Sequence, residues 1–378
     1  MDKKNKNPNV PNLRFSSFAD PFRIYTLKEV LQRISFPVTV DENKLYYQIG
    51  IRSHSKGIFY KEAEIGKQIG NKRIFWIEPN CLILNIVFAW EQAVAKTSEK
   101  EVGMVASHRF PMYKVLNNSL DYIVDFFKTE KGKQLLQMAS PGGAGRNKTL
   151  NQDFFLNSKI YLPSLNEQLK TSELIELIED RIETQIKIID TLSSQKKQIR
   201  NLIFKDIHKN ANCCIQDYVI YEQPQKYIVH STDYLSYGKD YTPVLTANQS
   251  FILGYTLEKD GIYEKGDCII FDDFTNENKY VDFPFKVKSS ALKILQTKEG
   301  LMLKFFYEYL QFLNFESTDH KRHYLSEVAV TDISVPNLKE QTFVCKIFTS
   351  FDNKLKNEEA LLEKYRLQKQ FLLNNLFI

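Results

Sequence analysis

The sequence predicts an α+β protein in which two tandem mixed α/β domains are separated by two long helices that form an antiparallel coiled coil. Three observations support this prediction. The 378 residues exceed what one small core needs and fit two domains. The chain resembles itself at an offset of 173 residues, which indicates a pseudo-twofold internal repeat. Two long segments carry apolar residues at alternating steps of three and four, the spacing of a coiled-coil seam.

The repeat is clearest where the long segments begin and end. Residues 160–168 read Ile-Tyr-Leu-Pro-Ser-Leu-Asn-Glu-Gln and reappear at 333–341 as Ile-Ser-Val-Pro-Asn-Leu-Lys-Glu-Gln. Continued without a gap, residues 195–204 fall on residues 368–377, and upstream residues 110–111 fall on residues 283–284. Residues 80–85 resemble residues 267–272 at an offset of 187. The first copy therefore has about fourteen extra residues, around positions 89–104.

Short apolar runs between glycine, asparagine and proline predict the strands of the mixed domains. Examples are residues 73–77, 268–271 and 283–287. The stretches 120–137 and 291–313 predict helices inside the domains. We place the first domain at residues 1–160, the central long helix at 161–208, the second domain at 209–332 and the C-terminal long helix at 333–378.

Each long helix starts with a capping-box pattern just after a proline. Ser164 precedes Glu167 by three residues, and Asn337 precedes Glu340 in the same way. Acidic residues crowd the first half of the central helix and basic residues its end, as the helix dipole favours. Each copy supplies one helix, whose apolar stripe needs a cover. The simplest solution pairs the two helices in antiparallel orientation.

Polar residues interrupt the two apolar seams at matching positions, where Gln185 corresponds to Glu358 and Lys196 to Lys369. A repeated polar seam residue suggests a register device or a partner contact. A lysine that extends its charge into solvent is the plainer interpretation. The residues predicted to form the coiled coil or to bind a partner are Ile178, Ile182, Ile189, Leu192, Lys196, Phe351, Leu355, Leu362, Tyr365 and Lys369.

The composition is that of an ordinary soluble protein, with 43% hydrophobic and 26% charged residues. The longest apolar run, residues 81–90, is too short to cross a bilayer, and the N-terminus lacks the apolar stretch of a signal peptide. We therefore expect no membrane contact and a cytoplasmic location. The net charge of +5 permits a nucleic-acid partner without arguing for one. Five cysteines without a CxxC pair predict reduced thiols and no metal site.

Several motifs resemble those of the specificity subunits of type I restriction-modification systems. The first long segment starts with Pro-x-x-x-Glu-Gln at residues 163–168, and both end with Gln-Lys-x-x-x-x-Asn-x-x-Phe, at 195–204 and 368–377. Residues 11–15 (Pro-Asn-Leu-Arg-Phe) are also typical of this family, as are residues 243–247, 253–256 and 270–275. The resemblance covers nearly the whole chain and is weakest in the first domain before Phe110.

This resemblance implies a non-catalytic subunit that reads a bipartite target in double-stranded DNA. Each mixed domain would be a target-recognition domain for one half of the target. The helices would act as a spacer and as the dock for two methyltransferase (modification) subunits, and motor-nuclease (restriction) subunits would complete the complex. This chain would hold no cofactor, because S-adenosylmethionine, ATP and Mg²⁺ would belong to the partner subunits.

Base reading and phosphate binding need basic, amide, hydroxyl and small residues. The glycine-rich stretch 142–148 has the basic residues to bring backbone N–H groups near a phosphate, although a solvated turn fits it equally well. The other candidates are by default ordinary surface groups. The residues predicted to bind DNA are Arg52, Ser53, His54, Lys72, Arg73, Arg109, Gly143, Arg146, Lys148, Asn248, Lys279, Tyr280, Lys288, Lys321 and Arg322.

The sequence gives little support to an enzyme. It lacks the Gly-x-x-x-x-Gly-Lys-Ser/Thr phosphate loop and the Asn/Asp-Pro-Pro-aromatic tetrapeptide expected of a DNA amino-methyltransferase. Asp267 with Glu277 and Lys279 superficially resembles a carboxylate–lysine nuclease site, but the first copy has no matching set. No catalytic residue is therefore predicted. A bivalent scaffold for a non-DNA partner and a self-contained nuclease remain the alternatives.

Overall fold

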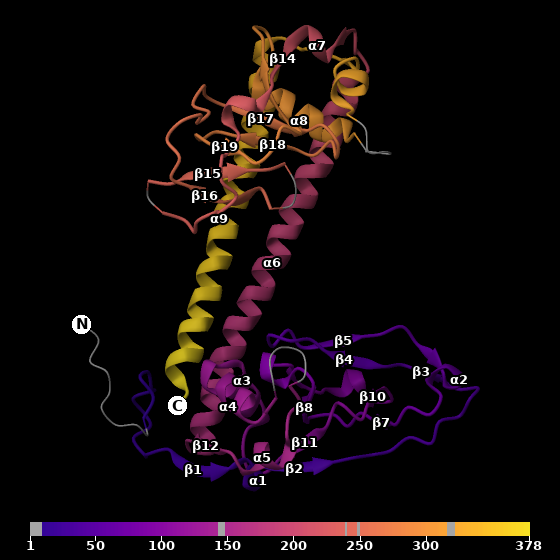
Figure 1. The fold of residues 1–378 in the computed structure, drawn as a ribbon, viewed down its shortest axis with the longest axis vertical. Helices are drawn as coiled ribbons and strands as arrows, with labels where there is room; N and C mark the ends of the chain where they lie inside the picture. Colours follow the sequence, from indigo (N-terminus) through magenta and orange to yellow (C-terminus); the bar gives the residue numbers. More distant parts are fainter. Residues whose placement is uncertain (1–9, 143–147, 239, 248–249, 316–321) are drawn as a thin grey trace. The chain divides into compact units, whose positions relative to one another are not determined.

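The computed structural model describes residues 10–142, 148–238, 240–247, 250–315 and 322–378. The chain divides into a first unit, Met1–Ile186 with Leu361–Ile378, and a second unit, Lys187–Ala360. Each unit contains a mixed α+β region and a part of each of two long helices, α6 (Leu165–His208) and α9 (Leu338–Leu376) (Figure 1).

The first unit is built around a four-stranded antiparallel sheet with the strand order β2-β11-β8-β9. The central strand β8 is fully buried, as expected of an unbroken apolar run. The elements are β1 (Arg23–Thr26), α1 (Leu27–Val30), β2 (Leu31–Ile34), β3 (Leu45–Tyr46), β4 (Ile49–Ile51), β5 (Ile58–Tyr60), β6 (Glu64–Ile65), α2 (Gly66–Ile69), β7 (Ile74–Trp76), β8 (Leu82–Leu84), η1 (Ala89–Glu91), β9 (Val94–Lys96), η2 (Glu99–Glu101), β10 (Val105–Ser107), β11 (Met112–Val115), α3 (Leu120–Lys128), α4 (Glu130–Met138), α5 (Gln152–Asn157) and β12 (Lys159–Leu162).

The second unit is built around a four-stranded antiparallel sheet with the strand order β14-β20-β17-β18. A smaller three-stranded sheet has the order β16-β15-β19, and its strands are interspersed along the chain with those of the larger sheet. The elements are β13 (Cys213–Cys214), α7 (Ile215–Tyr218), β14 (Val219–Glu222), η3 (Pro224–Tyr227), β15 (Thr242–Leu245), β16 (Ile252–Thr256), β17 (Cys268–Asp272), β18 (Asn278–Val281), β19 (Lys286–Val287), β20 (Leu292–Thr297), α8 (Leu303–Leu313), η4 (Tyr324–Val328) and β21 (Asp332–Ile333).

The internal repeat predicted from the sequence is visible in the topology of the two units. Strands β2, β11, β8 and β9 take the places of β14, β20, β17 and β18. In each unit a short strand before the first helical turn pairs with the strand that leads into a long helix, β1 with β12 and β13 with β21. Because β8 corresponds to β17, the sequence match between residues 80–85 and 267–272 is a structural equivalence.

Three sequence-based expectations inside the domains are wrong. Residues 291–302 are not helical, because Leu292–Thr297 form the inner strand β20, and Gly300 turns the chain with φ +92° before α8. The helix expected at 120–137 is broken at Thr129, whose side chain caps α4. Residues 110–111 precede the sheet strand β11, whereas residues 283–284 precede β19 of the smaller sheet, so that match is not structural.

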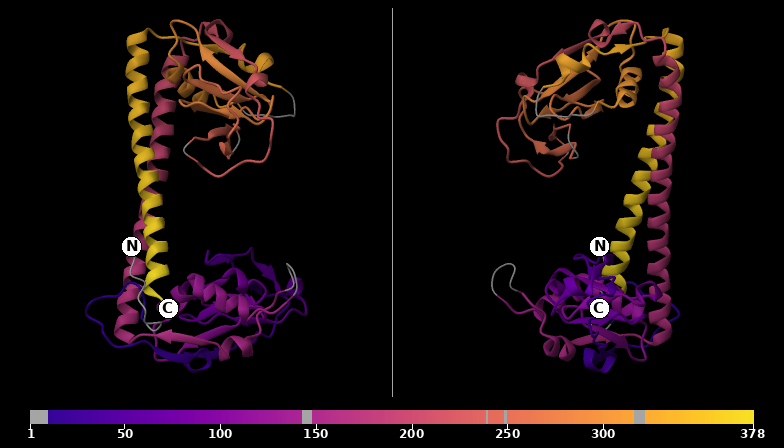
Figure 2. Two further views of the ribbon diagram at one scale, coloured as in Figure 1. Left: turned by 60° about the vertical axis from the view of Figure 1, so that its left-hand side comes forward. Right: turned by 90° about the vertical axis from the view of Figure 1, so that its right-hand side faces the viewer.

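Both units bury the start of one long helix against the end of the other. The first core contains Ile175 and Ile178 of α6 together with Leu372 and Leu376 of α9. The second contains Phe204 of α6 together with Val344 and Phe348 of α9. The helices therefore run antiparallel in each unit, and Figures 1 and 2 show them side by side. The predicted fold class is confirmed. No helix in the described residue ranges is long and apolar enough to cross a membrane.

The capping boxes at the helix starts are only partly formed. The Glu167 amide donates to Ser164 Oγ over 3.4 Å, and the Glu340 amide donates to Asn337 Oδ1 over 3.0 Å. The Glu167 carboxylate does not complete its box but accepts hydrogen bonds from the Arg14 guanidinium, at 2.7 and 2.8 Å. That ion pair attaches the N-terminal segment to α6.

Candidate nucleic-acid interface

Strands β7 and β10 bring two of the predicted basic residues together. They pair antiparallel, with Ser107 opposite Ile74, and the His108 amide donates to the Arg73 carbonyl over 3.2 Å. Arg73 and Arg109 are both exposed. Arg73 and His108 line a cavity of about 240 Å³ that also contains Arg33 of β2. A concave surface with cationic groups on its rim is the kind of feature that contacts a phosphate backbone.

A second group of predicted residues surrounds the 3₁₀ turn η1. Ser53 Oγ donates to the Glu91 carboxylate over 2.9 Å, and the His54 amide donates to the Glu91 carbonyl over 2.6 Å. The Lys148 ammonium lies 5.0 Å from the Trp90 ring centroid. Arg52 and Lys72 are exposed, and the Arg52 guanidinium lies 5.3 Å from the Phe59 ring. Sequence segments almost a hundred residues apart therefore meet at η1.

The predicted residues of the second domain are more scattered. Lys288 is exposed just after β19, and Lys279 is half-buried in β18. The Tyr280 hydroxyl donates to Asp267 over 2.6 Å, and its ring packs against the second core, so this side chain is already engaged within the protein. Arg322 is exposed, 4.0 Å from the Asp273 carboxylate. Gly143, Arg146, Asn248 and Lys321 lie outside the described residues.

His230, Glu258 and Asp260 form a cluster whose potential metal ligands lie within 4.8 Å of one another. The buried Lys286 ammonium lies 2.8 Å from the Glu258 carboxylate and donates to the Asp260 carbonyl over 2.6 Å. A fixed cation at this place opposes a second one, so the cluster is better explained as an ion pair that holds Lys286.

The residues predicted to form the seam of the long helices are buried or partly buried. Ile178, Leu192 and Leu362 are buried, whereas Ile182, Ile189, Phe351, Leu355 and Tyr365 are partly buried. The two seam lysines do not extend into solvent as the plainer interpretation expected. The Lys369 ammonium lies 2.7 Å from the Glu179 carboxylate, and the Lys196 ammonium lies 2.6 Å from the Asp352 carboxylate.

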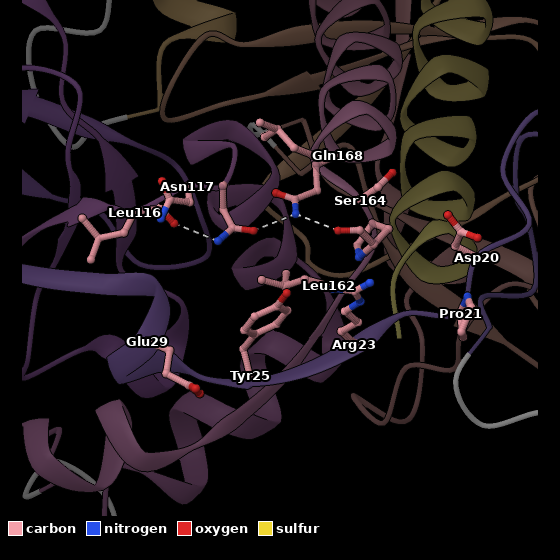
Figure 3. Close-up of a pocket in the computed structure, with 13 residues that line it drawn as sticks. Asp20, Pro21, Arg23, Tyr25, Glu29, Leu116, Asn117, Leu162, Ser164 and Gln168 are labelled. Carbon is pink, nitrogen blue, oxygen red and sulfur yellow. Dashed lines mark hydrogen bonds between the residues drawn. The ribbon is translucent and has the colours of Figure 1, made fainter.

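Gln168 of α6 fastens the start of this helix to the start of α3. Its side-chain oxygen accepts from the Ser119 amide over 3.0 Å, and its nitrogen donates to Asn118 Oδ1 and the Pro163 carbonyl over 2.8 and 3.0 Å. Figure 3 shows the last two bonds at the edge of a cavity of about 460 Å³. Gln341 of α9 makes the same arrangement, accepting from the Met302 amide and donating to two carbonyls.

An ion cluster, cluster A, joins the mixed region of the first unit to both helices and includes one buried acid, Asp125. It consists of Asp125 and Lys128 of α3, Glu179 of α6 and Lys369 of α9. Lys128 lies 2.8 Å from Asp125 and 3.0 Å from Glu179. Burial raises the pKa of Asp125 to about 6, although the Lys128 ammonium opposes this shift. Burial also acts on Glu179, but the Lys128 and Lys369 cations outweigh it and lower the pKa of that carboxyl.

The second unit contains an equivalent group, cluster B, made of Lys304 and Glu308 of α8, Asp352 of α9, and Lys196 and Arg200 of α6. The fully buried Glu308 carboxylate lies 2.7 Å from Arg200 Nη2 and 3.1 Å from Lys196 Nζ. Lys304 contacts both acids of the cluster. Burial opposes the charge of Asp352, but hydrogen bonds from Lys196 and Lys304 prevail and lower its pKa.

Sequence reasoning missed most of these polar residues. Glu179 and Asp352 occupy equivalent positions of the repeat, as do Lys196 and Lys369, so pairs of opposite charge at matching sites were a usable signal. Gln168 and Gln341 stand at equivalent positions of the repeat, but the sequence indicated no role for them. Asp125, Glu308 and Arg33 gave no pattern in the sequence, because only tertiary packing brings them to their partners.

Comparisons with known proteins were made on both sequence and fold. No family model matches the chain. A stretch of 123 residues is 48% identical to the Type I restriction enzyme EcoR124I/EcoR124II specificity subunit of Escherichia coli, and covers 31% of this chain. The match spans only 30% of that relative's length.

Two solved structures are similar over nearly the whole chain. The Type-I restriction-modification system S subunit from M. genitalium gives a TM-score of 0.61 at 14% identity, covering 98% of this chain and 99% of that one. A chain from a study of complex assembly and conformational transition of the type I R-M system gives 0.56 at 12% identity, covering 93% and 96%. The chain therefore has the fold of a type I restriction-modification S subunit and matches a specificity subunit in sequence over about a third of its length.

Proposed function

We propose that this chain is the sequence-reading subunit of a type I restriction-modification complex, without a catalytic site of its own. Each mixed α+β region acts as a target-recognition domain for one half of a bipartite site in double-stranded DNA. The long helices act as the spacer and as the dock for two methyltransferase subunits, which bring S-adenosylmethionine. Motor-nuclease subunits bring ATP and Mg²⁺, and the complex works in the cytoplasm.

The observation that carries this proposal is the duplicated architecture. Two mixed regions with equivalent sheets are each joined to the start of a long helix by a glutamine at the same position of the repeat. Two similar readers joined by a fixed spacer suit a target of two half-sites, because the second binding event becomes intramolecular once the first has occurred. A self-contained nuclease does not need such a duplication.

Within the first domain, the surface formed by Arg33, Arg73, His108 and Arg109 is the best candidate for DNA contact. Arginine and lysine give phosphate contacts, which set affinity and its salt dependence, and arginine also reads guanine in the major groove. Replacing one phosphate-binding cation weakens binding to all sequences, whereas replacing a base-reading arginine relaxes the choice at one position. These two outcomes assign the role of each residue.

The experiment that tests the proposal uses the full chain with and without a methyltransferase partner. A library of random DNA duplexes is incubated with S-adenosylmethionine, and the modified bases are mapped. We expect methylation only in the presence of both proteins, at sites with two fixed half-sites and a fixed gap. Methylation is compared between the chain in which Arg73 and Arg109 are both replaced by alanine and a control chain in which the exposed Lys364 of α9 is replaced by alanine.

Two results would contradict the proposal. Methylation or cleavage by the chain alone, in the presence of S-adenosylmethionine or Mg²⁺, would identify an enzyme. A methyltransferase complex that forms but modifies DNA without a bipartite preference would favour a bivalent scaffold that binds something other than DNA.

A further inference from the structure

The two ion clusters are related by the internal repeat, which links their roles. Glu179 and Asp352 are equivalent residues, and so are Lys369 and Lys196. In cluster A the lysine comes from α9 and the acid from α6, and in cluster B the lysine comes from α6 and the acid from α9. Each cluster also includes a buried acid from the first helix after the sheet, Asp125 of α3 or Glu308 of α8. Both clusters thus join a mixed domain to both long helices.

An apolar seam alone fixes the register of two paired helices less sharply than ion pairs do. Its spacing repeats every seven residues, so helices that slide by one heptad, about 10 Å, still pair apolar with apolar side chains. Ion pairs do not tolerate such a slide. The buried Glu308 carboxylate, for example, would lose Lys196 and Arg200 of α6 and keep the cost of its desolvation. Buried polar groups at seam positions are a known way to select one register.

The geometry points to Lys196 and Lys369 as positioning residues that lock the recognition domains to the helix pair and fix the distance between the two half-sites. This inference rests on the proposed function for the half-sites, and on the structure alone for the lock. It replaces the partner-contact role that the sequence suggested for both lysines, because their ammonium groups are already paired inside each unit.

The two locks are unequal. Cluster A balances two acids with two cations, and Lys369 forms its ion pair with Glu179, whereas Asp125 is paired with Lys128. Cluster B has a third cation, because Arg200 forms two hydrogen bonds to Glu308. The residue of α9 equivalent to Arg200 is the buried Leu373. We therefore expect the first domain to be held less tightly than the second when its lysine is removed.

The test compares the double variant Lys196→Met/Lys369→Met with the matched control Lys197→Met/Lys364→Met, in which exposed lysines of the same two helices are changed. Methionine keeps the length of the side chain and removes the charge. Hydrogen exchange on the isolated chain should become about tenfold faster in α3 and somewhat less in α8, and remain unchanged in the control. This part requires no DNA.

The second readout is the gap between half-sites in the methylation assay. We expect the ratio of modification at the preferred gap to that at neighbouring gaps to fall about tenfold in the double variant, with the bases of each half-site unchanged. The variant Lys196→Arg/Lys369→Arg should restore both readouts, and it separates loss of charge from loss of fold. Unchanged exchange in α3 and α8 of the methionine variant would overturn the inference. If hydrogen exchange in α3 and α8 is faster in the methionine variant but the natural chain never binds DNA, the proposed function would be overturned. The role of the two lysines in holding the domains to the helices would still stand.

Discussion

Lengthening both long helices by four residues should widen the gap between the half-sites that the protein recognises. The insertions belong after Ile186 in α6 and after Ala360 in α9, where the first unit meets the second along each helix. A site near the end of α6 is unsuitable, because Phe204 is fully buried and His208 Nδ1 lies 2.8 Å from the Tyr309 hydroxyl. An insertion of four residues is a stutter, which a coiled-coil seam accommodates by local unwinding.

The expected shift follows from helix geometry. Four residues add about 6 Å of rise and rotate a helix by about 400°, which leaves about 40° of net rotation. One base pair advances DNA by about 3.4 Å, and twists it by about 35° at 10–10.5 base pairs per turn. The translation therefore matches nearly two base pairs and the rotation matches one. We expect the preferred gap to grow by one or two base pairs.

The assay is mapping of modified bases with the methyltransferase partner, for the natural chain and the lengthened one. A matched control inserts two residues into each helix, which adds about 3 Å but rotates one domain by about 200°. That control should abolish bipartite recognition, because the second domain would face away from its groove. An unaltered gap after the four-residue insertion, or altered bases within a half-site, would refute the view that the helices measure the distance.

Three further predictions concern stability and assembly. Gln168→Ala should lower the free energy of unfolding in urea by about 2–3 kcal/mol, because it leaves the buried Ser119 amide without its partner. Gln198→Ala, at an exposed position of the same helix, should lower it by less than about 0.5 kcal/mol. Equal costs would argue against a stabilising role for the Gln168 hydrogen bonds. Asp125→Asn should change the pH dependence of stability. The folded pKa of Asp125, about 6, exceeds the ordinary 3.8, so this carboxyl favours the folded state below pH 4 and loses that contribution as pH rises through 6. Relative to the variant, the natural protein should lose up to about 3 kcal/mol between pH 4 and pH 7, and parallel urea-unfolding profiles would contradict this. Ile182→Asp or Leu355→Asp should cost about 2–4 kcal/mol or cause precipitation, whereas Thr184→Asp, on the exposed side of α6, should leave thermal unfolding and size-exclusion behaviour unchanged.

The features of this protein that could be predicted are those that depend on local sequence patterns. The seven-residue apolar repeat, with a proline and a capping residue before it, indicated both long helices, because helix formation depends on neighbours three and four positions away. The duplication was detectable because the two copies have the same residue types at the starts and ends of their long helices. A continuous apolar run such as residues 268–271 indicated a buried strand for the same local reason.

The stretch at 291–313 shows where local patterns fail. Its first part is as apolar as a helix face, but it became the inner strand β20 because β14 and β17 lie on either side of it. Strand pairing depends on residues far away in the sequence, so a short apolar run does not reveal whether it will be a strand or a buried helix.

The sequence by itself determined the two-copy architecture, the long helices and the family resemblance. Tertiary structure alone decided which charges came together as ion pairs. Lys196 and Lys369 looked like ordinary seam lysines, but the fold places Lys196 beside Glu308 of α8 and Lys369 beside Glu179 of α6. Arg33 joined Arg73 and His108 only through the pairing of β2, β7 and β10 with their neighbours. The physical reason is that charge interactions are felt over a few ångströms in space, whereas their partners here are separated by up to 190 residues of chain, from Glu179 to Lys369.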